Sequence, residues 1–288
     1  MRSWAAVAAV LVIVWALGAA GQELPAPTEW SVAGVKRQAI VMKPTRETDE
    51  PAPLLFVFHG HGGNMRNTAR QGFREAWPEA VIVCPQGLDT KTLYDPQGAR
   101  PGWQNRKGDA GGRDLAFFDA MLKTLTADQK VDERRVYATG HSNGGGFTYI
   151  LWAERGDVLA AVAPSSAVAT ALLPAFRVKA LPALHLAGQA DALVPFAKQE
   201  RSIALVRRIN QCEPEGKPWP AAGALKGTLY PSAAGAPLVT LIHAGGHRFP
   251  AEAPGLITRF LQEQVKKAPA PPGRSSYGPI RPPLRRAA

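Results

Sequence analysis

Seven short apolar runs, separated by amphipathic segments, restrict the folds open to this chain of 288 residues more than any other feature. The runs are rich in Val, Ile, Leu and Phe, and Gly or Pro often bounds them. They fall at 38–42, 54–58, 80–84, 135–139, 160–163, 183–187 and 238–242. Such short, nearly continuous apolar runs are typical of strands that are buried on both faces, as in a parallel sheet.

The segments between these runs carry helical patterns, at 68–77, 114–125, 143–153, 196–209 and 252–265. Residues 30–42 favour an antiparallel hairpin at one edge of the sheet. Strands that alternate with helices predict an α/β fold: a mostly parallel, doubly wound sheet with helices on both faces and no large cap domain. Two long irregular stretches, 87–112 and 211–227, remain, and loops of this length are often functional.

The two ends depart from this alternation. Residues 1–21 hold Arg2, then 14 apolar residues and a group of small residues, which is the layout of a secretory signal peptide. An uncleaved anchor is the alternative, because a membrane span needs about 20 apolar residues. Residues 268–288 are basic and rich in Pro, which predicts a disordered tail. The catalytic domain is expected at 22–267, and the protein is expected to be secreted.

Composition excludes several classes of protein. With 45% hydrophobic and 20% charged residues, the chain is neither a fibrous repeat nor a polytopic membrane protein. Most of the formal charge of +11 comes from the two end segments, since six basic residues lie in 266–288 and another is Arg2. No basic stripe interleaved with aromatics remains, so no nucleic-acid partner is expected. Cys84 and Cys212 are too few for a disulfide framework, and whether they pair stays open.

The strongest chemical signal is Gly-His-Ser-Asn-Gly at 140–144, the pattern G-x-S-x-G between a predicted strand and a predicted helix. The two glycines suit a tight strand-to-helix turn that leaves no room for side chains beside the serine. Ser142 is therefore the candidate nucleophile. A serine hydroxyl is weakly nucleophilic, so it needs a histidine base and an acid that orients that base.

Three histidines follow Ser142 in the sequence. His247 lies in a glycine turn after the last predicted strand, where its side chain can project over the carboxyl edge of the sheet. It is favoured over His243, which ends that strand, and over His185, which lies inside an apolar run.

The candidate acid is Asp191, which lies between a predicted strand and a predicted helix. It is favoured over Asp157, which suits a surface or capping position near a helix end. The order serine, acid, histidine is the one found when G-x-S-x-G marks a strand-to-helix turn of this kind.

A second glycine-rich turn, His-Gly-His-Gly-Gly at 59–63, follows a predicted strand. A backbone N–H near His61 and that of Asn143 can together stabilise an oxyanion. His59 and His61 could instead bind zinc, but no third ligand lies nearby in the sequence, so no metal is expected.

The order HGHGG, DLAFF, VDERRVYATGHSNGGG, AVAPSSA, LAGQADALVPF and GGHRFP resembles secreted serine esterases of the polyhydroxybutyrate depolymerase and feruloyl esterase type, over residues 30–265. The resemblance implies an α/β-hydrolase fold, with Ser142, Asp191 and His247 as the triad and oxyanion donors at Asn143 and near His61. It implies no cofactor. His141 and Gln189 depart from the residues usual in the family.

We therefore expect a secreted serine hydrolase that cleaves carboxylic esters of the feruloyl, acetyl-sugar or hydroxyalkanoate type through an acyl-enzyme on Ser142. Its partner would be a small or polymeric ester, with no membrane contact beyond an uncleaved anchor. Trp103, Tyr94, Phe147 and Trp219 are candidates to line a pocket for the substrate, although ordinary packing is favoured for any one of them. A serine peptidase of the same fold and a non-catalytic binding protein are the alternatives.

Overall fold

The computed structural model describes residues 23–128, 130–172 and 178–266. The expected signal peptide and the expected tail lie outside these residues. Among the helices in the described part of the chain, none combines the length and the apolar character that a bilayer span requires.

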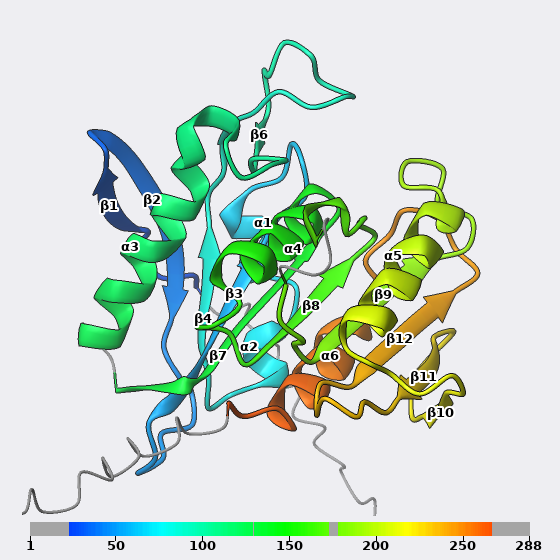
Figure 1. The fold of residues 1–288 in the computed structure, drawn as a ribbon. Helices are drawn as coiled ribbons and strands as arrows, with labels where there is room; N and C mark the ends of the chain where they lie inside the picture. The colour runs from blue at the N-terminus through cyan, green and yellow to red at the C-terminus, as the bar shows by residue number, and fades with distance from the viewer. Residues whose placement is uncertain (1–22, 129, 173–177, 267–288) are drawn as a thin grey trace, which may run out of the picture.

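A twisted ten-stranded sheet runs through the centre of the molecule (Figure 1). Its strands lie in the order β1 (Thr28–Val32), β2 (Val35–Met42), β4 (Val81–Pro85), β3 (Ala52–Phe58), β7 (Val131–His141), β8 (Ala161–Ser165), β9 (Ala183–Gly188), β12 (Leu238–His243), β11 (Lys226–Tyr230) and β10 (Lys217–Trp219). The strands from β4 to β12 are parallel, and antiparallel strands complete both edges. All seven predicted strands and the hairpin at 30–42 are confirmed.

Helices cover both faces of the sheet, as predicted (Figure 1). The helices α3 (Arg113–Asp128), α4 (Asn143–Arg155) and α5 (Phe196–Ile209) share one hydrophobic layer; α1 (Met65–Ala69), α2 (Phe73–Ala76) and α6 (Ala253–Gln262) share the other. Strand side chains alternate between the layers, so that Phe56 packs in the first and Leu55 in the second.

Three sequence predictions of local structure are wrong. The helix expected at 68–77 is divided into α1 and α2, because Gly72 between them has φ +92°, in the left-handed region. The last helix ends at Gln262 rather than at 265. The stretch 211–227 includes β10, and the stretch 87–112 includes the short pair β5 (Leu88–Asp89) and β6 (Pro101–Gly102) with the 3-10 helix η1 (Asp109–Gly112).

A buried ion pair fixes the end of the loop that precedes α3. Arg37 Nη2 donates to Asp114 Oδ1 at 2.8 Å, and both side chains are almost wholly buried. Burial lowers the pKa of Arg37, and the nearby Asp114 carboxylate opposes this shift. Asp114 Oδ2 also accepts from the backbone N–H of Gln104, at 2.8 Å. Residues 103–105 are thereby held against the carboxyl edge of the sheet.

The two cysteines are free thiols. Cys84 is buried in β4, and Cys212 lies half-buried beyond α5. Burial raises the pKa of each thiol. Neither thiol therefore has the lowered pKa that marks a reactive cysteine.

Candidate active site

Ser142 lies at a sharp turn between β7 and α4, with φ +58° and ψ −121°. This backbone conformation is strained for a residue that carries a Cβ. The turn excludes side chains on both sides of the serine. A Cβ on Gly140 would lie 2.5 Å from the Gly144 carbonyl oxygen, and one on Gly144 would lie 2.3 Å from that of Phe58. The glycines of the motif therefore have the steric role expected from the sequence.

Asp191 and His247 form a hydrogen-bonded pair at the same edge of the sheet. Asp191 lies in the loop after β9 and His247 in the loop after β12. His247 Nδ1 lies 2.8 Å from Asp191 Oδ2. A carboxylate only accepts, so His247 carries its proton on Nδ1 and its Nε2 is left with a lone pair.

The less favoured acid and base candidates lie elsewhere. His185 is fully buried in β9. His243 ends β12, where its Nδ1 accepts from Gly245 N at 3.1 Å. Asp157 is exposed beyond the end of α4. None of the three replaces a member of the Asp191–His247 pair.

A cavity of about 540 Å³ is lined by five of the predicted site residues. Ser142 and His247 line it, as do Asn143, His61 and Tyr94. The remaining lining is mixed in polarity: Gly60, Thr92, Leu93, Arg100, Gln104, Asn105, His141, Gly146, Ser166, Ala167, Val168, Thr170, Ala171, Leu193 and Val194.

His141, the residue before Ser142, packs against the base. Its ring centroid lies 4.8 Å from that of His247 and 5.8 Å from that of Phe249. Its Nδ1 lies 3.2 Å from Ser165 Oγ. Burial, with a smaller contribution from His247, lowers the pKa of His141 to about 4, and the Asp191 carboxylate opposes this shift. The ring is therefore uncharged at neutral pH.

His59 and His61 bond protein groups through three of their four ring nitrogens, and within the described residues the buried Nδ1 of His61 has no hydrogen-bond partner. His59 Nδ1 donates to Gly60 O at 2.7 Å, and its Nε2 accepts from Gly87 N at 2.9 Å. His61 Nε2 donates to Asp95 Oδ2 at 3.0 Å. Within the described residues, no group of three or more His, Cys, Asp and Glu side chains is placed to hold a metal ion.

Asn143 joins the nucleophile turn to the loop before α3. Its Oδ1 accepts from Trp103 N at 2.7 Å, and its Nδ2 donates to Trp103 O at 3.0 Å. Both polar atoms of the side chain are thus engaged by the protein. The backbone of Asn143 is the part that remains for substrate.

Three of the four aromatic substrate-binding candidates do not line the cavity, which corrects the expectation for them. Trp103 and Phe147 are fully buried and stack on each other, with centroids 5.5 Å apart. Both belong to the core beneath the cavity and do not line it. Trp219 packs in the opposite layer, under Arg259. Tyr94 does line the cavity: its side chain is exposed, and its hydroxyl donates to Leu193 O at 2.8 Å.

Two cavity residues, Arg100 and Ser166, were not identified from the sequence. Ser166 has φ +46°, and within the described residues its buried Oγ has no hydrogen-bond partner. Arg100 brings a cation to the exposed part of the cavity lining. Arg100 was not singled out from the sequence, and Ser166 entered only as part of the AVAPSSA segment, because the place of both residues in the cavity depends on how separate loops meet.

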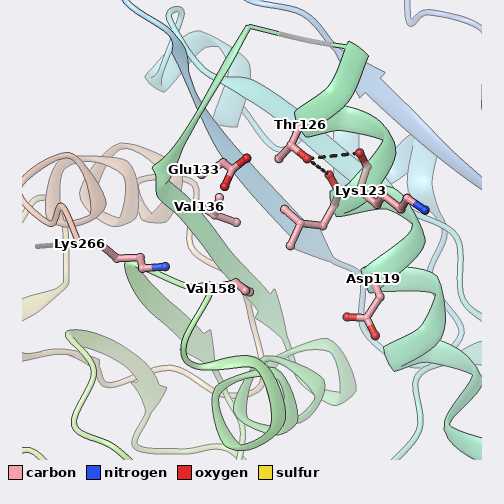
Figure 2. A pocket seen from close by; sticks show the side chains of 8 residues that line it. Asp119, Lys123, Thr126, Glu133, Val136, Val158 and Lys266 are labelled. Carbon is pink, nitrogen blue, oxygen red and sulfur yellow. Dashed lines mark hydrogen bonds between the residues drawn. The ribbon is translucent and has the colours of Figure 1, made fainter. Parts of the chain in front are cut away.

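A second hollow, between α3 and β7, has a different character (Figure 2). Its described lining consists of Asp119, Leu122, Lys123, Thr126, Glu133, Val136, Val158 and Lys266. The Thr126 hydroxyl is turned back onto the carbonyl groups of Leu122 and Lys123. These lining side chains include no base beside a nucleophile, so the hollow does not compete with the Ser142 cavity as a hydrolytic site.

Comparison with known proteins agrees with the fold and the motifs. Residues 44–207 match the family model described as Esterase PHB depolymerase. The chain is 36% identical over 132 residues to a probable feruloyl esterase C of Aspergillus clavatus, a match that covers 44% of each chain. It is 28% identical over 237 residues to feruloyl esterase D of Neurospora crassa, with 78% of each chain covered. The match to the Aspergillus clavatus protein thus spans less than half the length of that relative.

A solved carboxylesterase from Bacillus cereus shares the fold. The two structures superpose with a TM-score of 0.57 at 15% identity, over 79% of this chain and 94% of that chain. The doubly wound sheet described above is accordingly an α/β-hydrolase fold. Because the family model covers more than half of the sequence, this chain belongs to the polyhydroxybutyrate depolymerase family of esterases, as its motifs predicted.

Proposed function

We propose that the protein is a secreted serine hydrolase that cleaves carboxylic esters through an acyl-enzyme on Ser142. One observation carries the proposal: the Asp191–His247 pair, with its bond of 2.8 Å, opens onto the same cavity as the strained serine. The signal peptide expected at residues 1–21 supports secretion.

The proposed reaction is acyl transfer to water. His247 Nε2 takes the proton of the Ser142 hydroxyl as the oxygen attacks the ester carbonyl carbon. The same nitrogen then protonates the leaving alcohol, and an acyl-enzyme remains. Water, deprotonated by His247, attacks the acyl carbon and releases the acid. Asp191 fixes the imidazole tautomer and stabilises its protonated form.

Backbone N–H groups would stabilise the oxyanion that forms in each step. The proposed donors are Asn143, at the start of α4, and His61, in the glycine-rich turn after β3. Gly62 N and Gly63 N are already used, by Pro101 O and Gly60 O. The bond between His61 and Asp95 and the bonds between Asn143 and Trp103 hold the two donor segments in place. Each such donor is typically worth on the order of 3 kcal/mol.

The proposed substrate is an ester of an aromatic acid of the feruloyl kind. The two fungal relatives are named feruloyl esterases. The cavity has room for an aromatic acyl group, and Leu193 and Val168 offer apolar contacts. Acetyl-sugar and hydroxyalkanoate esters are the substrates to compare.

The test compares hydrolysis of nitrophenyl and feruloyl esters by the wild type and by Ser142→Ala. We expect the variant to lose about 10⁴-fold or more in kcat. Ser31→Ala, which changes an exposed serine at the far edge of the sheet, is the matched control and should keep full activity. Full activity in Ser142→Ala would contradict the proposal. Cleavage of peptides in preference to esters would identify a peptidase instead.

A further inference from the structure

Three buried polar side chains form a chain of hydrogen bonds behind the proposed triad. Tyr149 on α4, His185 on β9 and Gln199 on α5 are all fully buried. Tyr149 Oη lies 2.6 Å from His185 Nδ1, and His185 Nε2 lies 3.3 Å from Gln199 Oε1. Gln199 Nε2 lies 3.2 Å from Asp191 Oδ2. Buried polar groups are costly unless they are hydrogen-bonded, so each side chain in this row must keep the orientation that satisfies its bonds.

One arrangement of protons satisfies every bond in the chain. Asp191 as a carboxylate only accepts, so Gln199 must turn its NH₂ group toward it; the second N–H donates to Val194 O at 2.7 Å. The Gln199 oxygen therefore faces His185 and accepts from Nε2–H. His185 Nδ1 is then the acceptor for the Tyr149 hydroxyl.

This row of hydrogen-bonded side chains carries no charge other than that of Asp191. Burial lowers the pKa of His185 to about 4, and the bond to Gln199 only partly opposes this shift. Burial also raises the pKa of the Tyr149 hydroxyl. Both groups are neutral near pH 7, so the direction of the bonds does not change there.

Gln199 contacts the oxygen of Asp191 that matters for the base. Asp191 Oδ1 accepts from the backbone N–H groups of Leu193 and Val194, at 2.9 and 2.8 Å. Oδ2 accepts from His247 Nδ1 and from Gln199 Nε2. The loop thus fixes one oxygen, and the side chain from α5 fixes the other.

We propose that Gln199 is a positioning residue, which holds Asp191 Oδ2 in line with His247 Nδ1 while His185 and Tyr149 keep its amide in the donating orientation. The inference rests on the proposed function, because it needs Asp191 to orient a catalytic His247. A rotated amide would place Oε1 against the carboxylate, and the two acceptors would repel each other. The Tyr149 hydroxyl prevents this rotation by fixing the tautomer of His185.

The test uses Gln199→Met, which keeps the length of the side chain and removes the amide. We expect kcat for a nitrophenyl ester to fall by about 10- to 100-fold, because small misplacements of a catalytic pair have effects of this size. KM should change by less than about twofold, since Gln199 does not line the cavity. Tyr149→Phe, which removes one hydroxyl, should lower kcat by about two- to fivefold.

A double-mutant cycle separates positioning from a merely structural role. In an Asp191→Ala background, Gln199→Met should leave the residual kcat unchanged within about twofold, because the group that it positions is gone. A structural role would lower kcat equally in both backgrounds and would overturn the inference. If Gln199→Met does not fold, the same cycle is run with Tyr149→Phe, and an unchanged kcat in that variant contradicts the inference.

A different result would contradict the proposed function itself. If Ser142→Ala and Asp191→Ala keep wild-type activity, the triad itself is wrong. If both lose activity while Gln199→Met and Tyr149→Phe keep it, only the positioning role of Gln199 is wrong.

Discussion

His141 shows how a single residue can restrain the proposed base without taking part in the reaction. Its ring contacts His247 and Phe249, and its pKa of about 4 keeps it uncharged beside a base that must accept a proton. A charged neighbour at this distance would oppose protonation of His247. The neutral ring therefore supplies a contact surface at no electrostatic cost to the base.

A pair of substitutions at 141 tests this role. His141→Ala removes the ring, so His247 gains rotational freedom, and we expect kcat to fall by about tenfold. His141→Phe keeps a ring against His247 and loses only the contact with Ser165, so it should retain most of the activity. Steady-state kinetics on one small ester, with unfolding temperatures as a check on folding, measure both. Equal losses in the two variants would show that the imidazole nitrogen, rather than the ring contact, matters.

At the scale of the element, the approach of α4 to β3 determines where the nucleophile lies. Gly144 lies so close to the end of β3 that a Cβ would meet Phe58 O at 2.3 Å and His59 O at 2.6 Å. Gly146, one half-turn further along the same helix, has open space around its Cβ position. Lack of space therefore requires glycine at 144 but not at 146.

This contrast predicts opposite results for the same substitution. Gly144→Ala should push α4 away from β3, lower the free energy of unfolding by about 2 kcal/mol or more, and lower kcat by about 100-fold. Gly146→Ala should fold as well as the wild type or gain up to about 1 kcal/mol, because alanine is the better helix former. Urea unfolding and ester hydrolysis measure both. Similar unfolding free energies for the two variants would contradict this account of the turn.

Elements with a strong pattern could be predicted from the sequence, and short ones could not. The parallel strands are continuous apolar runs, and α5 has the predicted bounds, because its pattern is long and uninterrupted. The division of α1 from α2 depends on one positive φ angle at Gly72, which a helical pattern does not reveal. The strand β10 has three residues, too few to show a period of two.

At the scale of the whole molecule, topology made the triad candidates predictable. The carboxyl ends of neighbouring parallel strands meet at one edge, so residues that follow β7, β9 and β12 were expected to meet there. Ser142 and His247 line one cavity, and Asp191 is hydrogen-bonded to His247. Which of the aromatic candidates line the cavity, and the hydrogen-bonded network from Tyr149 to Gln199, were not predicted. Both depend on contacts between elements far apart in the sequence, for which a single chain shows no periodic signal.

Two buried imidazoles also give the whole molecule a pH-dependent stability. The pKa values of His141 and His185 are each lowered by burial from 6.5 to about 4. Between pH 6.5 and 4 the unfolded chain therefore binds protons at both sites that the native protein does not, and stability rises with pH across this window. Acidification through the same window removes on the order of 3 kcal/mol of stability for each ring.

We therefore expect the free energy of unfolding, measured in urea at constant ionic strength, to fall by several kcal/mol between pH 6.5 and about 4.5. Asp95 and Asp132 contribute little in this window, because hydrogen bonds from backbone and side-chain groups outweigh burial and lower the pKa of each carboxyl below 3.8. His185→Phe loses bonds to Tyr149 and Gln199 and is less stable at every pH, but it should show a shallower dependence on pH, since one of the two titrating groups is gone. The quantity to compare is the slope of the free energy of unfolding against pH, not the absolute stability of either protein. A slope in His185→Phe equal to that of the wild type would show that His185 is already protonated in the native protein or remains neutral in the unfolded one.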